Sequence, residues 1–259
     1  MRAVILKSYG DELPDFVSDW PEPSDPVEGD VQIRVKAASI NPIDWKIMAG
    51  KMKPLLPLKP PFVLGSDGSG IIEKVGSGVS DFAPGDEVYF RTGKDRMGTF
   101  AEKMNIRADE VAKKPASLKF EEAASIPLVA LTSYQAFFEK ADLQPGQKVL
   151  IHAGSGGVGT AAIQIAKEKG AEVTTTAGPS GIDLVKRMGA DHIINYRETD
   201  FSATTDRFDL VFDTMGGDTL RKSFLVTKPG GYVVSIASLP TPDIAKQYGK
   251  DPLLQFMLY

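Results

Sequence analysis

The 259-residue sequence has no cysteine and only two histidines. Without cysteine, the protein has no disulfide framework, no thiolate nucleophile, no iron–sulfur cluster and no thiolate-bound zinc. His152 and His192 are far apart in the sequence, and neither belongs to a His-Glu-x-x-His pattern. We therefore predict that the protein has no metal ligands. The absence of cysteine also fits a reducing compartment, and we expect a cytoplasmic protein.

Long apolar runs and clusters of basic residues are missing as well. No apolar run approaches the roughly 18 residues that a membrane helix needs, and no small-residue cleavage site of a signal peptide follows Met1–Tyr9. The 30 basic and 34 acidic residues give a net charge of −4. No run of lysine or arginine is long enough to bind a phosphate backbone. We expect neither a membrane span nor a nucleic-acid partner.

As far as about Ala116, the chain has the pattern of β structure. Val31, Ile33 and Val35 alternate with polar residues, which is the period of a half-buried strand. The stretch Val63–Val75 is rich in glycine, which indicates tight turns and bulges in a small, curved sheet. This part of the chain is therefore predicted to form a β-rich domain.

After Lys119 the pattern changes to strands that alternate with helices. Phe120–Glu139 is predicted to be helical, with an interruption near Pro127. Beyond it we expect strands at residues 148–152, 172–176, 192–195, 208–213 and 232–237, and helices at residues 158–169, 182–188 and 218–227. Such alternation is typical of a parallel sheet with helices on both faces. The predicted fold class is α/β plus β: a β-rich domain at residues 1–118, followed by a doubly wound domain at residues 119–259.

The first strand of the second domain leads into a glycine turn, Gly154-Ser155-Gly156-Gly157-Val158-Gly159. Gly154, Gly156 and Gly159 occupy the positions of a G-x-G-x-x-G dinucleotide fingerprint. In that motif the first glycine allows a tight turn, the second lets the backbone approach a pyrophosphate, and the third lets helix and strand pack closely. Strand, helix and second strand follow in the order that a βαβ unit needs, so we predict a dinucleotide site. The buried stripe of the helix would consist of Val158, Ala161, Ala162, Ile165 and Ala166.

The second strand of this unit favours NADPH over NADH. An NAD site usually has Asp or Glu about 20 residues after the glycines, where it binds the ribose 2′-hydroxyl. This chain has Thr175–Ser180 there, and the next acidic residue is Asp183. A 2′-phosphate could be held by hydroxyl and basic side chains and by backbone N–H groups, namely those of Ser180, residues 178–181, Lys186, Arg187 and Tyr196. Lys186 and Arg187 fit a solvated helix face equally well.

Several segments together resemble a known family. They are Ser39–Lys46, Leu64–Gly70, Phe82–Val88, Gly98–Glu102, Leu131–Tyr134 and the glycine turn. In order and spacing, as far as about Ala237, they resemble the zinc-independent quinone oxidoreductases and enone reductases of the medium-chain dehydrogenase/reductase superfamily. Zinc-dependent relatives place a cysteine where Asn41 stands and a His-Glu pair where Ser66-Asp67 stands.

The resemblance implies a fold and a set of cofactor contacts. The fold is a GroES-like catalytic domain followed by a Rossmann dinucleotide-binding domain. The implied contacts with NADPH are Lys46, Thr132, Gly154, Ser155, Gly156, Gly157, Val158, Gly178, Pro179, Ser180, Gly181, Tyr196, Ser235, Ile236 and Ala237. Lys46 and Thr132 would lie at the nicotinamide end, and Tyr196 and Ser180 near the adenosine phosphate. Alternatively, Thr132 caps a helix, Tyr196 packs in the core and Lys46 is solvated.

The implied activity is NADPH-dependent hydride transfer, without zinc, to a quinone or to the C=C bond of an α,β-unsaturated carbonyl compound. Asn41, Asp44 and Lys46, in one loop of the family, are the candidate catalytic residues, because amide and ammonium groups stabilise negative charge on a substrate oxygen. Asp44 is expected to orient Lys46 or the loop backbone, and the final proton is expected from water. The alternatives are a non-catalytic NADPH-binding sensor or structural relative, and a zinc-independent reductase of another substrate class.

Set against this family, the chain looks short. Relatives continue with another sheet strand and a segment that returns to the catalytic domain. Only five strands of an expected six-stranded sheet can be counted, and the chain ends in the apolar stretch Leu253–Tyr259. We therefore expect a truncated chain that exposes an apolar edge and turns over poorly. The expected partner is a small-molecule quinone or enone. A homodimer stays an open alternative to a monomer, because the family is commonly dimeric.

Overall fold

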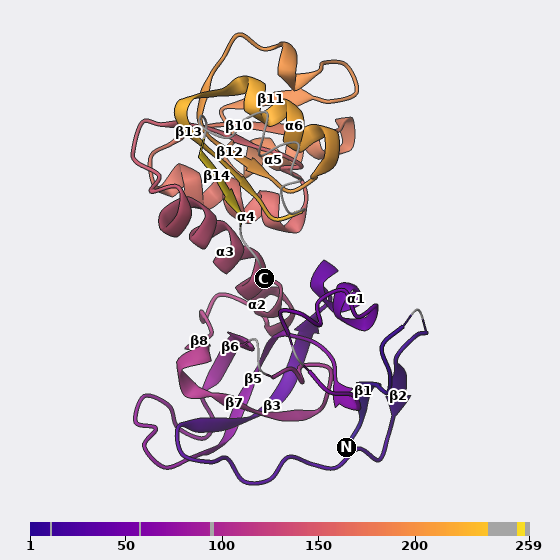
Figure 1. The fold of residues 1–259 in the computed structure, drawn as a ribbon. Helices are drawn as coiled ribbons and strands as arrows, with labels where there is room; N and C mark the ends of the chain where they lie inside the picture. The colour runs from indigo at the N-terminus through magenta and orange to yellow at the C-terminus, as the bar shows by residue number, and fades with distance from the viewer. Residues whose placement is uncertain (11, 57, 94–95, 238–252, 257–259) are drawn as a thin grey trace. The chain divides into compact units, whose positions relative to one another are not determined.

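The computed structural model describes residues 1–237, except residues 11, 57 and 94–95, together with the backbone of Leu253–Phe256. The chain divides into two compact units: unit 1 is Met1–Leu128, and unit 2 begins at Val129 (Figure 1). This division lies further along the chain than residue 118 because helix α2 (Phe120–Ala124) packs on the antiparallel sheet of unit 1. The Ser69 hydroxyl of that sheet donates a hydrogen bond to the Phe120 carbonyl oxygen at 2.7 Å. That residues 1–118 form a catalytic domain stays a prediction.

Unit 1 consists of two antiparallel sheets. The larger has the order β7-β3-β5-β6-β8, and its strands are β3 (Asp30–Ser39), β5 (Asp67–Val75), β6 (Glu87–Arg91), β7 (Lys103–Arg107) and β8 (Val111–Lys113). The smaller has the order β2-β1-β4, with β1 (Ala3–Leu6), β2 (Asp15–Val17) and β4 (Phe62–Val63). A short 3₁₀ turn, η1 (Ala108–Glu110), precedes β8.

The predicted strand and bulges of unit 1 are confirmed in the larger sheet, but burial does not alternate along β3, because Gln32 is also buried, at 3% exposure. Val31 and Ile33 are fully buried and pack with Ile72 and Phe90 in the core. The pairing of β3 with β5 shifts register between Val35 and Ala37. A Cβ atom on Gly70 would lie 2.3 Å from the Arg34 carbonyl oxygen, so only glycine allows the two strands to approach this closely.

Helix α1 (Pro42–Met48) corrects the expectation of a loop at this point of unit 1. Asn41 is the N-cap residue, and Pro42, at the first helical position, has a backbone angle already suited to a helix. The Asp44 carboxylate accepts the Asn41 backbone N–H at 2.7 Å. Asn41-Pro42 and Asp44 therefore form a helix start signal within a region that is otherwise β structure.

Unit 2 contains one parallel sheet with the order β11-β10-β9-β12-β13-β14. Its strands are β9 (Lys148–Ile151), β10 (Glu172–Ala177), β11 (His192–Asn195), β12 (Phe208–Asp213), β13 (Thr227–Ser235) and β14 (Leu253–Phe256). The count of five strands is therefore wrong: β14 pairs with β13, with Leu253 opposite Tyr232. It was missed because this short apolar stretch was interpreted as a chain end. The side chains of Leu253–Tyr259 lie outside the described residues.

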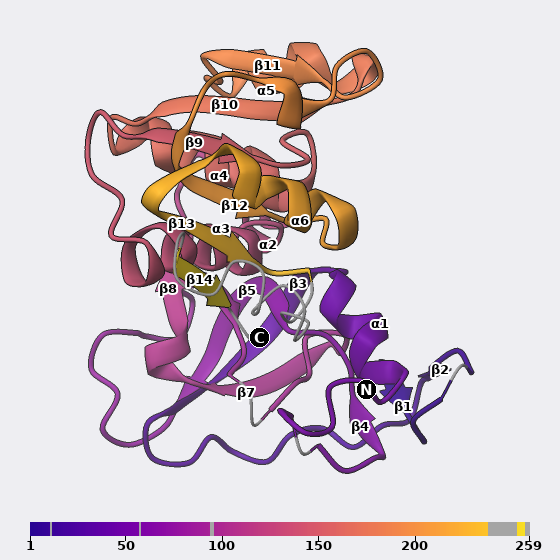
Figure 2. The same ribbon diagram turned by 45° about the horizontal axis from the view of Figure 1, so that its top comes forward.

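Helices flank this sheet on both faces. They are α3 (Pro127–Tyr134), which continues as the π-helix η2 (Gln135–Lys140), α4 (Gly157–Glu168), α5 (Ile182–Arg187) and α6 (Gly217–Val226), with short 3₁₀ turns η3 (Pro179–Gly181) and η4 (Phe201–Ala203). The chain moves from β9 to β10 in one direction across the sheet and from β12 to β13 in the other. Right-handed crossovers then put α4 and α6 on opposite faces (Figure 2). The predicted fold class is confirmed.

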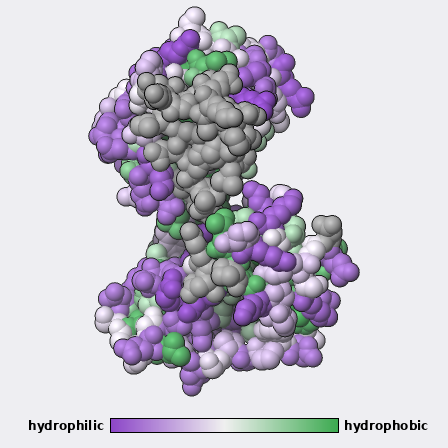
Figure 3. Space-filling view, in the orientation of Figure 1, coloured by the Kyte–Doolittle hydropathy of each residue, from purple (hydrophilic) through white to green (hydrophobic). Residues whose placement is uncertain are grey.

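The surface of the described residues is mostly hydrophilic on the face drawn in Figure 3. Large apolar side chains such as Leu13 and Ile40 are nonetheless exposed, at 87% and 84%. Among residues 1–237 and 253–256, apart from the gaps, no helix is both long and apolar enough to cross a membrane.

Candidate active site

The glycine turn joins β9 to α4, and its first residues form hydrogen bonds with β10. Ala153 begins it with a positive φ of 51°, which an L-residue seldom adopts. The Ala153 N–H donates to Thr176 Oγ1 at 3.0 Å, and the Gly154 N–H donates to the Thr176 carbonyl oxygen at 2.9 Å. Thr176, which the sequence did not single out, therefore fixes the first bend of the turn.

Two glycines of the turn are required by close packing. A Cβ on Gly154 would lie 2.0 Å from Thr175 Oγ1, and a Cβ on Gly159 would lie 2.3 Å from the Ala153 carbonyl oxygen. By contrast, the nearest atom to a Cβ on Gly156 would be the Ala153 carbonyl oxygen at 3.3 Å. The first and third fingerprint glycines thus serve the fold, while Gly156 keeps the exposed side of the turn free of a side chain.

The first turn of α4 presents unbonded backbone N–H groups. Gly156 is the N-cap residue, and no side chain caps the helix. The N–H groups of Gly157, Val158 and Gly159 donate no hydrogen bond within the described part of the chain. Ser155, Gly156 and Gly157 are exposed. Three aligned donors at the positive end of a 12-residue helix suit a diphosphate, so this turn fits a dinucleotide cofactor.

The other predicted cofactor residues of the sheet follow the carboxyl ends of its strands. Residues Gly178, Pro179, Ser180 and Gly181 follow β10, Tyr196 follows β11, and Ser235, Ile236 and Ala237 stand at the end of β13. Parallel strands end at the same edge of a sheet, so these residues share the edge that carries the glycine turn. The reversal of strand order between β9 and β12 marks that edge as the usual ligand site of such a fold.

Two close contacts connect this edge. The Tyr196 hydroxyl would lie 2.8 Å from a Cβ on Gly178, and Ser155 Oγ would lie 2.6 Å from a Cβ on Gly181. Tyr196 is 55% exposed, which rules out its predicted alternative as a core residue. The Arg197 guanidinium lies over the Tyr196 ring at 5.6 Å and adds positive charge beside it.

Thr132 belongs to α3, which packs beside the glycine turn. Val129 Cγ1 would lie 3.5 Å from a Cβ on Gly157, and the Ser133 hydroxyl is 3.4 Å from the Val158 carbonyl oxygen. Thr132 itself is buried, at 1% exposure, in the middle of α3 and is not its N-cap.

Asp213, at the end of β12, is a buried carboxylate that the sequence did not single out. It accepts hydrogen bonds from the Met215 and Gly216 N–H groups at 3.0 Å and from the Ser235 hydroxyl at 2.7 Å. Asp213 therefore shapes the β12 end and fixes the Ser235 side chain. These bonds engage both oxygens of the Asp213 carboxylate.

His152 follows directly after β9 and is buried, at 1% exposure. Burial lowers its pKa to about 4, although the negative charge of Asp213 opposes this. Its Nε2 lies 3.1 Å from the Ser223 hydroxyl, and its ring packs edge-on against Phe201. The residue joins β9 to α6 and is structural.

In unit 1, the candidate Asn41 belongs to a buried polar cluster around Asp67. Asp67 Oδ2 accepts hydrogen bonds from Ser39 Oγ at 3.1 Å, Asn41 Nδ2 at 3.1 Å and the Leu128 N–H at 3.2 Å. Asn41 Nδ2 also donates to Ser39 Oγ at 3.1 Å. A carboxamide nitrogen has two hydrogens, so Ser39 and Asp67 engage both donors of Asn41. Asp67 lies in a motif noted in the sequence, but nothing there predicted that it binds Asn41.

The other two candidates of unit 1 share helix α1 with different surroundings. Asp44 is buried, at 3% exposure, and binds the Asn41 backbone, as one of its expected roles required. Lys46 is half-buried, and its ammonium group forms no hydrogen bond or ion pair with the described residues. Of the three candidates, Lys46 alone keeps its donors available.

Burial changes the acidity of both carboxyl groups in this cluster. It raises the pKa of Asp67 to about 6, against the hydrogen bonds from Ser39, Asn41 and Leu128 and the positive charge of Arg91. It also raises the pKa of Asp44 to about 6, against the hydrogen bond from the Asn41 backbone. Both groups therefore bind a proton at a higher pH than exposed carboxyls do.

Two protein-family models match the chain. The alcohol dehydrogenase GroES-like domain matches residues 27–116, and the zinc-binding dehydrogenase model matches residues 157–255. The structure of the quinone oxidoreductase from Coxiella burnetii superposes with a TM-score of 0.86 at 35% identity, over 100% of this chain and 82% of that one. The chain belongs to the quinone oxidoreductase family of medium-chain dehydrogenases/reductases. The predicted family is confirmed.

Two further relatives add detail. The Escherichia coli quinone oxidoreductase, solved in complex with NADPH, is 30% identical with a TM-score of 0.83, over 99% of this chain and 80% of that one. The 2-methylene-furan-3-one reductase of Solanum lycopersicum is 38% identical over 83% of this chain. The chain spans 56% of the length of that curated relative.

The second family model is named for zinc binding, but the described residues of this chain do not include a matching group of zinc ligands. The chain has no cysteine. Among the described residues, no three His, Asp or Glu side chains group as a metal site would require. In the present chain, Asn41 donates a hydrogen bond to Asp67, and Ser66 lines a cavity.

Proposed function

We propose that this protein is an NADPH-dependent oxidoreductase that transfers a hydride to quinones or to the C=C bond of α,β-unsaturated carbonyl compounds. The observation that carries the proposal is the exposed glycine turn, whose first helical turn presents three unbonded N–H groups. The similarity to the 2-methylene-furan-3-one reductase of Solanum lycopersicum and to the quinone oxidoreductase of Coxiella burnetii supports the substrate class.

The choice of NADPH rests on the side chains after β10 and β11. No carboxylate stands between Thr175 and Ser180, where an NAD site would need one. Exposed Ser180, the Tyr196 hydroxyl and the Arg197 guanidinium would instead hold the 2′-phosphate, because hydroxyl and guanidinium groups donate to phosphate oxygens. Gly154, Ser155, Gly156, Gly157 and Val158 would hold the diphosphate, and Thr132 with Ser235, Ile236 and Ala237 would line the rest of the cofactor site.

When bound, NADPH would supply a hydride, with its electron pair, to an electron-poor carbon of the substrate. In an enone, the electron pair of the C=C bond would then pass toward the carbonyl oxygen, and a proton from water would complete the reduction. Lys46 is the proposed donor to the developing negative charge, since its ammonium group is available. Asn41 and Asp44 hold the first turn of the helix that carries Lys46.

The experiment that tests this function is turnover of the purified chain. Consumption of NADPH is followed by its absorbance with a simple quinone and, separately, with a simple enone. Turnover with either substrate, and slower turnover with NADH, is expected. Tight binding of NADPH without turnover of any acceptor would instead favour a cofactor sensor. The cytoplasmic location and the homodimer stay predictions.

A further inference from the structure

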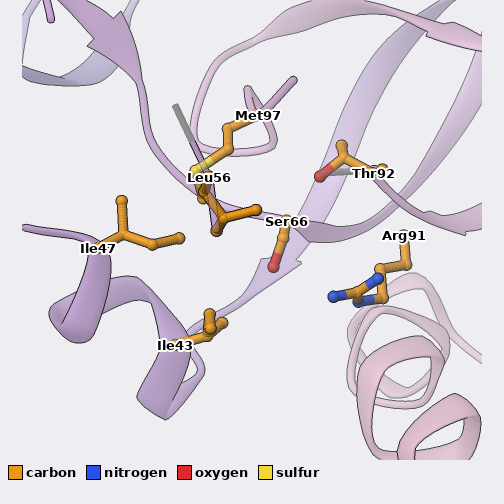
Figure 4. Close-up of a pocket in the computed structure, with 8 residues that line it drawn as sticks. Ile43, Ile47, Leu56, Ser66, Arg91, Thr92 and Met97 are labelled. Atoms are coloured by element: carbon orange, nitrogen blue, oxygen red, sulfur yellow. The ribbon is translucent and has the colours of Figure 1, made fainter. Parts of the chain in front are cut away.

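A small cavity of unit 1 lies between helix α1 and the ends of β5 and β6. Its volume is about 20 Å³, and its lining consists of Ile43, Ile47, Leu56, Ser66, Arg91, Thr92, Gly93 and Met97. Figure 4 shows the Ser66 and Thr92 hydroxyls and the Arg91 guanidinium on one side of this space, with the aliphatic chains of Ile43, Ile47 and Leu56 opposite.

Two hydroxyl groups in this cavity are buried without a hydrogen-bond partner. Ser66 is 6% exposed and Thr92 is 1% exposed, and neither Ser66 Oγ nor Thr92 Oγ1 bonds to any described residue. Their backbones are paired, since the Thr92 N–H donates to the Ser66 carbonyl oxygen at 2.8 Å. An unsatisfied buried hydroxyl costs about 1–3 kcal/mol, so two of them facing one cavity point to an occupant with an oxygen atom, such as a water molecule or a ligand.

The third polar group of the cavity adds positive charge. Arg91 stands opposite Asp67 across the β5–β6 pair, and its charge acts on that carboxyl. The remaining walls are mostly aliphatic, and low polarity strengthens any hydrogen bond or charge interaction made there. Two hydroxyls that can donate and a guanidinium that can only donate favour an electron-rich oxygen as the occupant.

The size of the cavity narrows the class of ligand further. A space of about 20 Å³ exceeds the roughly 10–15 Å³ that one water molecule requires, but it is far too small for a ring. One oxygen atom of a larger molecule fits. Asn41 cannot supply donors to such an oxygen, because Ser39 and Asp67 engage both of its N–H groups.

We propose that Ser66, Thr92 and Arg91 form a binding site for the carbonyl oxygen of the quinone or enone and stabilise the negative charge that develops on it. This inference rests on the proposed function. As hydride adds to the substrate carbon, an electron pair moves onto this oxygen, and the two hydroxyls and the guanidinium then donate to it. None of the three residues was among the catalytic or cofactor-binding residues predicted from the sequence.

The test removes the two hydroxyls and keeps Arg91. In Ser66→Ala and Thr92→Val no intramolecular hydrogen bond is lost, so both variants, and their combination, should unfold at or above the wild-type temperature. The double variant is expected to lose about 10²-fold in kcat with little change in KM for NADPH. The matched control is Thr99→Val, because Thr99 Oγ1 is equally buried and unpartnered but does not line this cavity. Wild-type kcat in the folded double variant would overturn the proposal.

A second readout separates this inference from the proposed function. The carbonyl stretch of a ¹³C-labelled saturated ketone bound to the protein is measured by infrared difference spectroscopy. A lower frequency than in water is expected for the wild type and Thr99→Val, and a return toward the solution value for the double variant. If the wild type shows this spectral shift but no turnover, the proposed function is contradicted, whereas the binding site for the carbonyl oxygen is supported. Turnover in the wild type with identical spectra in all variants would sink the site alone.

Discussion

The Asn41 side-chain amide donates to Asp67 Oδ2 at 3.1 Å, and this contact joins two segments of unit 1 that are 26 residues apart in the sequence. Asp67 also binds Ser39 at the end of β3 and the Leu128 N–H at the start of α3. One buried carboxylate thus holds the end of a strand and the starts of two helices. Its protonation state should therefore affect the stability of unit 1.

Asp67→Asn tests this dependence on pH. The folded pKa of about 6 lies above the ordinary value of roughly 3.9 for an unfolded chain. The folded chain therefore binds a proton at Asp67 more tightly than the unfolded chain does. This contribution to the free energy of unfolding is fully present below about pH 4 and is lost as pH rises through 6. Between about pH 8 and pH 4.5, the free energy of unfolding of the wild type should gain about 2 kcal/mol relative to Asp67→Asn.

Urea unfolding of both proteins at the two pH values measures this difference. Asp81→Asn, which removes an exposed carboxyl of the same unit, serves as the control. A difference between wild type and Asp67→Asn that is the same at both pH values would show that Asp67 is ionised equally in the folded and unfolded chains.

Gly154, which is buried, and Gly156, which is exposed, should respond differently to substitution by alanine. Gly154→Ala forces a Cβ to 2.0 Å from Thr175 Oγ1, so we expect a loss of about 2–4 kcal/mol in stability. Gly156→Ala meets only the Ala153 carbonyl oxygen, at 3.3 Å, and should fold normally but bind NADPH at least 10-fold more weakly, since its methyl group blocks the diphosphate.

Thermal unfolding and fluorescence titration with NADPH separate the two effects. In the Gly154→Ala background, Thr175→Ala removes the clashing oxygen and should restore part of the stability. If Gly156→Ala bound NADPH like the wild type, the cofactor would not lie against this turn.

Tyr196→Phe should weaken binding of NADPH and leave binding of NADH unchanged. The Tyr196 hydroxyl lies against Gly178, beside the expected 2′-phosphate site. A hydrogen bond to a charged group contributes about 1.5–3 kcal/mol, so an affinity loss of about 10-fold or more is expected. Titration of the variant with both cofactors measures it, with Tyr89→Phe in unit 1 as the control. An equal loss of affinity for both cofactors would show that Tyr196 does not bind the 2′-phosphate.

Lys46→Ala should lower turnover more than cofactor affinity. Lys46 is the one candidate of unit 1 whose donors are available, so its loss should reduce kcat by about 10-fold or more. Lys51→Ala is a matched control, because the Lys51 ammonium group already lies over the Trp45 ring at 4.9 Å. Steady-state kinetics with an enone decide the matter. Unchanged kcat and unchanged NADPH affinity in Lys46→Ala would show that Lys46 is a solvated residue without a role in the reaction.

The regular part of unit 2 could be predicted from the sequence because its signals are local. The strands at 192–195 and 208–213 have the expected bounds, since apolar runs there end at turn residues. The rotation of α4 was less well predicted. Its buried residues include Gly159 and Ile163 rather than Val158 and Ile165. The helix has small or apolar residues on several sides, so the pattern does not mark one face.

The polar cluster of unit 1 could not be predicted from the sequence because its contacts are long-range. Ser39, Asn41, Asp67 and Leu128 meet only after β3, β5 and the start of α3 are assembled. The motifs located Asn41 and Asp67 but not the bond between them. Helix α1 was missed because it is only 7 residues long and interrupts a β-rich region.

The most direct test of the central claim is isotope transfer from the cofactor. In separate reactions, the protein is incubated with an enone and with NADPH deuterated at one or at the other face of nicotinamide C4, and the product is analysed by mass spectrometry and NMR. The account predicts one deuterium at the β-carbon of a saturated carbonyl product, from one face of the cofactor only. NADPH that binds in the fluorescence titration but transfers deuterium to the enone from neither face of C4 would contradict it.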